Sequence, residues 1–133
     1  MKPEQFIREF GVDKAREVVE GAPEGTTHIH SVTWQNYKQG GNNNYVWGRS
    51  DQAGWYLSIY DTLNGMMILE DLKRLVESVD RVNEHGGYLA AKELLSFLIV
   101  HQGAFGKSAV SDETINSLKA AILDHESIYG GGE

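Results

Sequence analysis

The chain has 133 residues, no cysteine and a formal net charge of −7, from 12 basic and 19 acidic residues. This length is sufficient to bury one hydrophobic core, so we expect a single domain over residues 1–133. The lack of cysteine excludes disulfides, thiolate zinc sites and cysteine nucleophiles. The acidic balance disfavours a general duplex-DNA binder, because it repels the phosphate backbone.

The sequence contains no candidate for a membrane span or an export signal. A charged segment follows Met1, and the longest apolar run, residues 94–100, is far shorter than the roughly 18 residues that a spanning helix needs. We therefore expect a cytoplasmic protein, which the absence of cysteine also favours.

Residues 1–25 are predicted to form two short helices around a glycine corner. Pro3 suits a first helical turn, and Gly11 would end the first helix. Asp13 is the expected N-cap of the second helix, which Gly21 and Pro23 would close. The apolar stripe of the first helix consists of Phe6, Ile7 and Phe10.

Residues 26–61 are predicted to form a three-stranded antiparallel meander. This stretch holds all three tryptophans and four of the six tyrosines, in short runs between Gly and Asn clusters, a pattern that is typical of strands and turns. The expected strands are residues 27–34, 45–47 and 55–60, joined by a loop at 39–44 and a turn at 49–54.

Strict alternation assigns the strand side chains to faces. His28 and His30 would share one face of the first strand, while Tyr37 would fall beyond it or at a bulge. On the last strand, Trp55, Leu57 and Ile59 would line one face, with Tyr56 and Tyr60 on the opposite face. We expect the tryptophans to fill a thin core; the tyrosines suit either the core or an exposed interaction surface.

Residues 66–129 are predicted to be helical. A helical apolar period over residues 66–83 predicts the longest helix of the chain, with a start near Ile68 to Glu70 and an end at His85-Gly86-Gly87. Residues 88–100 predict a second helix that is mostly core, and Ser111 is the expected N-cap of a third helix with Ile115, Leu118, Ile122 and Tyr129 on one side. The fold class is therefore α+β, with a three-stranded meander packed by about five helices.

No catalytic constellation emerges from the sequence. Gly106-Lys107-Ser108 is similar to the end of a phosphate-binding loop, but His101 stands where that pattern needs glycine. His28 and His30 have a spacing that can serve a metal, yet no third ligand is identifiable. We expect no catalytic residues, no metal and no cofactor.

Two binding functions remain. In the first, exposed meander side chains anchor a partner protein, since Tyr and Trp supply large contact area at low entropic cost. In the alternative, the same rings stack the bases of single-stranded nucleic acid while Lys38 and Arg49 meet phosphates, although two cations are few for such a groove. The predicted partner-binding residues are Tyr37, Tyr45, Trp47, Tyr56, Tyr60 and Asn43.

A resemblance to a known class supports the first function. The segment Gly21-Ala22-Pro23-Glu24-Gly25-Thr26-Thr27-His28, the spaced Tyr and Trp residues after it, Val76-Glu77-Ser78-Val79 and His85-Gly86-Gly87 resemble the small accessory proteins of lambdoid phages and prophages. The resemblance implies a cytoplasmic protein of an infected or lysogenic bacterium that binds and modulates a host protein, such as a defence or nucleic-acid-processing factor. Its motifs are structural, so it transfers no functional residue.

Overall fold

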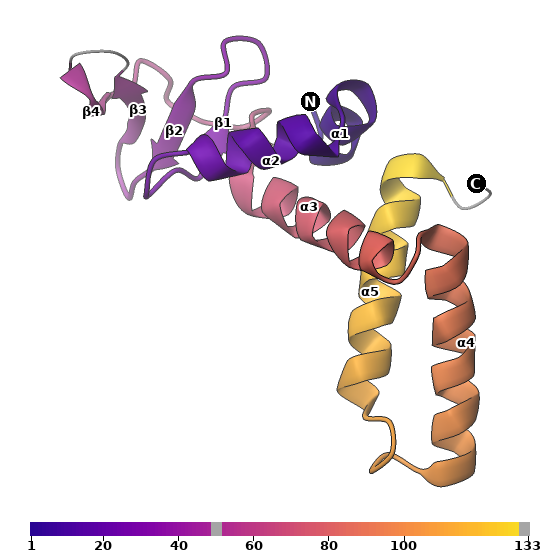
Figure 1. Ribbon diagram of the computed structural model, residues 1–133. Helices are drawn as coiled ribbons and strands as arrows, with labels where there is room; N and C mark the ends of the chain where they lie inside the picture. The colour runs from indigo at the N-terminus through magenta and orange to yellow at the C-terminus, as the bar shows by residue number, and fades with distance from the viewer. Residues whose placement is uncertain (49–51, 131–133) are drawn as a thin grey trace. The chain divides into compact units, whose positions relative to one another are not determined.

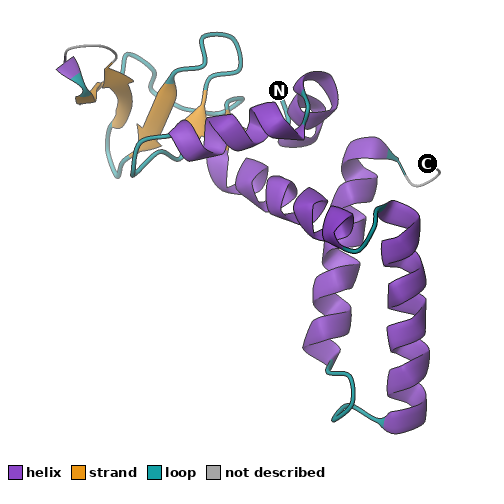
Figure 2. Ribbon diagram, viewed as in Figure 1, coloured by secondary structure: helices purple, strands orange, loops and turns teal. Residues whose placement is uncertain are grey.

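The computed structural model describes residues 1–48 and 52–130, which form five helices and one five-stranded antiparallel sheet (Figures 1 and 2). The predicted α+β class with about five helices is confirmed, while the sheet has five strands rather than three. The sequence predicts one domain; the chain divides into two compact units, Met1–Lys73 and Arg74–Glu133. The helices are α1 Pro3–Phe10, α2 Val12–Gly21, α3 Leu69–Glu84, α4 Tyr88–Phe105 and α5 Asp112–Tyr129.

The sheet belongs to the first unit and has the strand order β4-β3-β2-β1-β5. Every neighbouring pair is antiparallel. Two of its strands, residues 36–39 and 67–68, were not predicted. Tyr37 was expected beyond the first strand or at a bulge, and the two residues 67–68 are too few to show an alternating pattern. The strands are β1 His28–Ile29, β2 Asn36–Gln39, β3 Asn44–Gly48, β4 Gly54–Leu57 and β5 Met67–Ile68.

The predicted first strand, residues 27–34, is wrong beyond Ile29. The chain turns there: the His30 N–H donates to the Gln35 carbonyl at 3.0 Å, and the Trp34 N–H donates to the His30 carbonyl at 2.9 Å. Trp34 adopts φ 63°, a left-handed conformation that a bulky residue rarely takes. The turn places its indole edge-on to two rings of α1, Phe6 at 5.3 Å and Phe10 at 5.6 Å.

The two N-terminal helices form as expected, with one corrected boundary. Pro3 occupies the first turn of α1, and Phe6 and Ile7 are buried. The N-cap of α2 is Gly11, at φ 91°, rather than Asp13. Asp13 instead lies in the first helical turn, where its carboxylate accepts a 2.7 Å hydrogen bond from Arg16.

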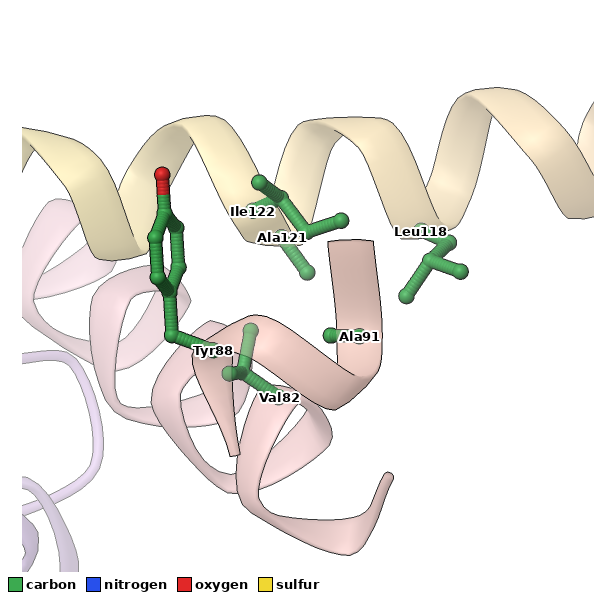
Figure 3. Packing of buried hydrophobic residues seen from close by; sticks show 6 residues of the cluster. All are labelled: Val82, Tyr88, Ala91, Leu118, Ala121 and Ile122. Atoms are coloured by element: carbon green, nitrogen blue, oxygen red, sulfur yellow. The ribbon is translucent and has the colours of Figure 1, made fainter. Parts of the chain in front are cut away.

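The second unit is built on the helical hairpin of α4 and α5 together with the C-terminal part of α3. Figure 3 shows its core, where α3 and α4 meet α5. Two alanines in this core, Ala91 and Ala121, allow close approach of the helix backbones. The cluster consists of Val82, Tyr88, Ala91, Leu118, Ala121 and Ile122, flanked by Leu94, Leu95 and Leu98.

The ends of these helices follow the predicted signals. Gly86 and Gly87, at φ 94° and 107°, turn the chain after α3, and Ser111 caps α5 by accepting the Thr114 N–H at 3.1 Å. Between α4 and α5, Gln102 donates to the Val110 carbonyl and to Asp112, both at 2.9 Å. These contacts fasten the irregular loop between α4 and α5 to the end of α4.

Two expectations for the helical part are wrong. The longest helices are α4 and α5, with 18 residues each, whereas α3, which begins at Leu69 within the expected range, has 16. The predicted core character of α4 also fails, since only one side of it packs. Its exposed apolar side chains are Leu89, Phe97, Ile99, Val100 and Phe105.

Polar groups add specific contacts inside the second unit. The Ser78 hydroxyl is buried and donates to Asp124 at 2.7 Å, and Arg74 approaches the same carboxylate at 3.5 Å. The Tyr88 hydroxyl donates to Glu126, and this hydrogen bond raises the pKa of Tyr88. Among the described residues, no helix combines the length and the apolar composition that crossing a bilayer requires.

Candidate protein-binding surface

The hairpin of β3 and β4 carries three of the six side chains predicted to contact a partner, Tyr45, Trp47 and Tyr56. Its register places Tyr45 opposite Leu57 and Trp47 opposite Trp55. Since residues paired in this way point to the same side of a sheet, these four side chains share one face. Tyr56, one position along the strand, points to the other face.

On the first face, aromatic rings surround a lysine. Trp47 and Trp55 meet edge to face with centroids 5.2 Å apart. The Lys38 ammonium lies 5.3 Å from the Tyr45 ring and 5.0 Å from the Trp55 ring. All four side chains are half-buried, so the cluster is a preformed surface rather than a core.

On the opposite face, Tyr56 is fixed across the hairpin. Its ring covers Gly48, where a Cβ would come within 2.5 Å of a ring carbon. Its hydroxyl donates to the Gln52 carbonyl at 3.0 Å. With 47% of its surface exposed, Tyr56 offers a rigid ring to a partner at little further entropic cost.

Tyr37 does not reach this surface. It lies on the same face as Tyr56 but is only 4% exposed. The rings of Tyr60, at 5.8 Å, and His30, at 6.5 Å, pack against it, and burial raises its pKa, with a smaller contribution from Tyr60. Tyr37 is thus a core residue, covered in part by the exposed Tyr60.

The turn between β2 and β3 combines one structural and one exposed asparagine. Asn44 donates from its side chain to the carbonyls of Tyr60 and Asp61, at 3.3 and 3.1 Å, and so holds the segment after β4. Asn43 is exposed, and its carbonyl closes the turn by accepting from Gly40 at 2.9 Å. Of the two, only Asn43 is placed to meet a partner.

The open edge of the sheet is the feature that sequence reasoning missed. Among the described strands, β4 pairs on one side only. The Ser58 N–H donates to Asn44 of β3 at 2.8 Å, and the two-residue alternation therefore directs the N–H and C=O groups of Trp55 and Leu57 to the open side. The strand order is needed to recognise an edge, so no local sequence signal identifies it.

Side chains along this edge are apolar and exposed. Leu57 is 65% exposed and Ile59, just beyond the strand, is 92% exposed. The prediction that Trp55 and Leu57 share a face opposite Tyr56 agrees with the register. Ile59 and Tyr60 lie outside the strand, so the predicted strand over residues 55–60 is too long at its C-terminal end.

The described residues give little to the nucleic-acid alternative. Lys38 is held over two rings, and Arg49 lies outside the described residues, as do residues 50 and 51 of the predicted turn at 49–54. Lys107, in the segment similar to a phosphate-binding loop, pairs with Asp112 at 2.8 Å. His101 and Gly103 lie within α4, so that segment does not form a loop around an anion.

The two histidines considered for a metal are used differently. His28 contacts the Thr27 hydroxyl through Nδ1 at 2.8 Å, and burial lowers its pKa. His30 lies in the turn after β1, where Nδ1 accepts the N–H groups of Val32 and Thr33 at 3.1 and 3.2 Å. Within residues 1–48 and 52–130, no three His, Asp or Glu side chains gather closely enough to hold a metal ion.

A hollow of the first unit lies beside α2. It has a volume of about 470 Å³ and is lined by the segment that follows α2 and by the start of α3. Its ionisable side chains are Glu24, His28, Glu70 and Lys73. Its lining also includes Thr27, whose hydroxyl contacts Nδ1 of His28 at 2.8 Å.

Comparisons with known proteins do not assign a function. No protein-family model matches the chain, and searches of curated proteins and of solved structures give no significant match. The geometry of the β3 and β4 hairpin is therefore the basis for the function proposed below.

Proposed function

We propose that this protein is a non-catalytic accessory protein that binds another protein along the open edge of β4. The observation that carries the proposal is the edge strand itself, with outward backbone groups at Trp55 and Leu57 and exposed apolar side chains on both faces. An extended peptide that adds to such an edge gains main-chain hydrogen bonds, and its alternating side chains give specificity.

Strand addition also resolves an apparent conflict among the predicted contact residues. Tyr45 and Trp47 lie on one face, and Tyr56 on the other, so a flat partner resting on either face would miss half of them. An added strand points successive side chains to both faces. It is therefore the binding mode that uses Tyr56 together with the Trp55 and Leu57 side of the hairpin.

The resemblance to accessory proteins of lambdoid phages supports a bacterial host protein as the partner. In this function the protein would occupy or modulate that host protein without chemistry of its own. The acidic balance, 19 carboxylates against 12 cations, favours partners with a basic surface, because complementary charge accelerates association.

Two variants at one position test the binding mode. Leu57→Ala removes the side chain, and Leu57→Pro additionally removes an N–H that faces the open side, which an edge strand tolerates. Each variant and the wild type serve as bait in a bacterial lysate, and captured proteins are quantified and titrated by calorimetry. We expect Leu57→Pro to bind at least tenfold more weakly than Leu57→Ala, since strand addition loses a main-chain hydrogen bond.

Circular dichroism of both variants serves as the folding control. A captured protein that binds Leu57→Pro and Leu57→Ala equally well would contradict strand addition. Loss of binding in Tyr56→Ala alone would then place the contact on the face of the sheet instead.

A further inference from the structure

One side of α4 is exposed and apolar although the other side packs against α5. The packed side carries Tyr88, Ala91, Leu94, Leu95 and Leu98. The opposite side carries Leu89, Phe97 and Val100, which are 67%, 61% and 71% exposed. Exposure of several large apolar side chains on one helix face is costly in water and marks an interaction surface.

The same part of α4 lacks charge. Residues 94–105, twelve in a row, contain no Asp, Glu, Lys or Arg. A chain of net charge −7 repels a second copy of itself wherever acidic side chains meet, so a neutral face is where two copies approach most easily. An anionic membrane surface fits less well, because it attracts basic segments and this face has none.

Three rings form a continuous row on the exposed side. Phe97, His101 and Phe105 follow each other at intervals of four residues, with ring centroids 5.5 and 4.6 Å apart. Residues at this spacing form one ridge on a helix surface. Glu93 continues the ridge by one position towards the N-terminus of α4. Because each step of four residues turns about 40° around the helix, Glu93 and His101 are the ridge positions that face a partner together with Phe97.

We propose that this ridge joins two copies of the chain as an antiparallel α4 pair, with the two-fold axis passing Phe97. Glu93 and His101 are each four residues from Phe97, so the carboxylate of one copy meets the imidazole of the second copy. Because the interface is two-fold, the contact between Glu93 and His101 occurs twice in it.

The available area suits such a dimer. Four exposed apolar side chains lie on the ridge or beside it, Leu89, Phe97, Val100 and Phe105, and together present about 500 Å², more than half of the roughly 800 Å² that each partner contributes to a standard interface. Small side chains at Ser96, Gly103 and Ala104 would allow the helices to approach closely. This inference is independent of the function proposed for β4.

Sedimentation equilibrium of the full-length chain tests the dimer directly. We expect the wild type to approach twice the chain mass of 14.8 kDa as its concentration rises. Phe97→Glu places two carboxylates near the axis and should weaken dimerisation by about 100-fold or more. Val32→Glu, at a 77% exposed apolar residue of the first unit, is the matched control and should leave the mass unchanged.

A charge exchange tests the antiparallel arrangement. His101→Glu sets two carboxylates against each other and should weaken the dimer about tenfold, whereas the combination of Glu93→His and His101→Glu restores the pair. Within one helix these positions are about 12 Å apart along the axis, so the restoration must act between copies. A wild type that stays monomeric up to about 1 mM, or a dimer that Phe97→Glu leaves intact, would overturn the proposal. A dimer that the double exchange fails to restore would overturn the antiparallel arrangement.

Discussion

The sheet unit and the helical unit reach a buried core by different routes. In the first unit, buried side chains such as Phe6, Ile29 and Met67 come from separate short elements, two of them strands of only two residues. In the second unit, the core comes from long helices at regular spacing, with Leu118 and Ile122 one turn apart on α5. The first route leaves rings and an edge exposed, while the second leaves one continuous helix side exposed.

The largest expected effects come from truncating one core residue in each unit. Phe6 is fully buried, and Phe6→Ala should lower the free energy of unfolding by about 3–5 kcal/mol. Leu118, 2% exposed, should cost about 2–5 kcal/mol in Leu118→Ala. All three tryptophans, Trp34, Trp47 and Trp55, lie in the first unit, so denaturation followed by fluorescence reports that unit.

The same denaturation followed by far-UV circular dichroism is weighted towards α4 and α5. We expect Phe6→Ala to shift mainly the fluorescence transition and Leu118→Ala mainly the dichroism transition. Equal shifts of both signals in both variants would show that the units unfold together. The two cores would then differ in how their side chains pack but not in when they unfold.

A smaller effect is expected at the hairpin of the first unit. Asn44→Ala removes the hydrogen bonds to the carbonyls of Tyr60 and Asp61 and should cost about 1–2 kcal/mol in urea denaturation. Asn43→Ala, at the exposed position beside it, should cost less than about 0.5 kcal/mol. Similar costs for the two variants would mean that the segment after β4 is held by other contacts.

The smallest expected effect is a difference between the two units in how their stability depends on pH. Burial lowers the pKa of His28, so as pH falls below its ordinary value of 6.5 the unfolded chain binds a proton that the folded chain resists, and the first unit loses stability. In the second unit, Lys107 and then Gln102 lower the pKa of Asp112. That contribution is present above the ordinary value of 3.8 and is lost only as pH falls below it.

Urea denaturation by fluorescence at about pH 7.5 and about pH 5.5 measures the His28 effect. We expect a lower midpoint at the acidic pH in the wild type and a smaller difference in His28→Gln. An equal pH difference in the two proteins would assign the effect to another group.

Regular helices were predictable because their signals are local. The glycine corner at Gly86 and Gly87 and the cap at Ser111 lie where the sequence places them, since capping and positive φ depend on neighbouring residues only. The apolar composition of α4 misled the prediction in a specific way. Periodicity identifies a helix, but a helix that is apolar on both sides does not reveal which side a partner covers.

The sheet and its surface depended on contacts that the sequence does not display. The turn after Ile29 is set by Trp34 packing on Phe6 and Phe10, which are more than twenty residues away in sequence. The pairing of β5 with β1 brings Met67 beside Ile29. The sequence left open whether Tyr56 and Tyr60 are buried or exposed. Their rings are exposed, and the division of the aromatic side chains between two faces required the register.

The short length of β4 affects the tendency of the protein to aggregate at high concentration. An unprotected sheet border invites indiscriminate stacking of chains into fibrils, and the hazard grows with its length. The four residues of β4, beginning at Gly54, offer too few main-chain hydrogen bonds for such growth, although they would suffice to pair with one short peptide. Extending this border by a few β-branched residues should promote aggregation of the protein.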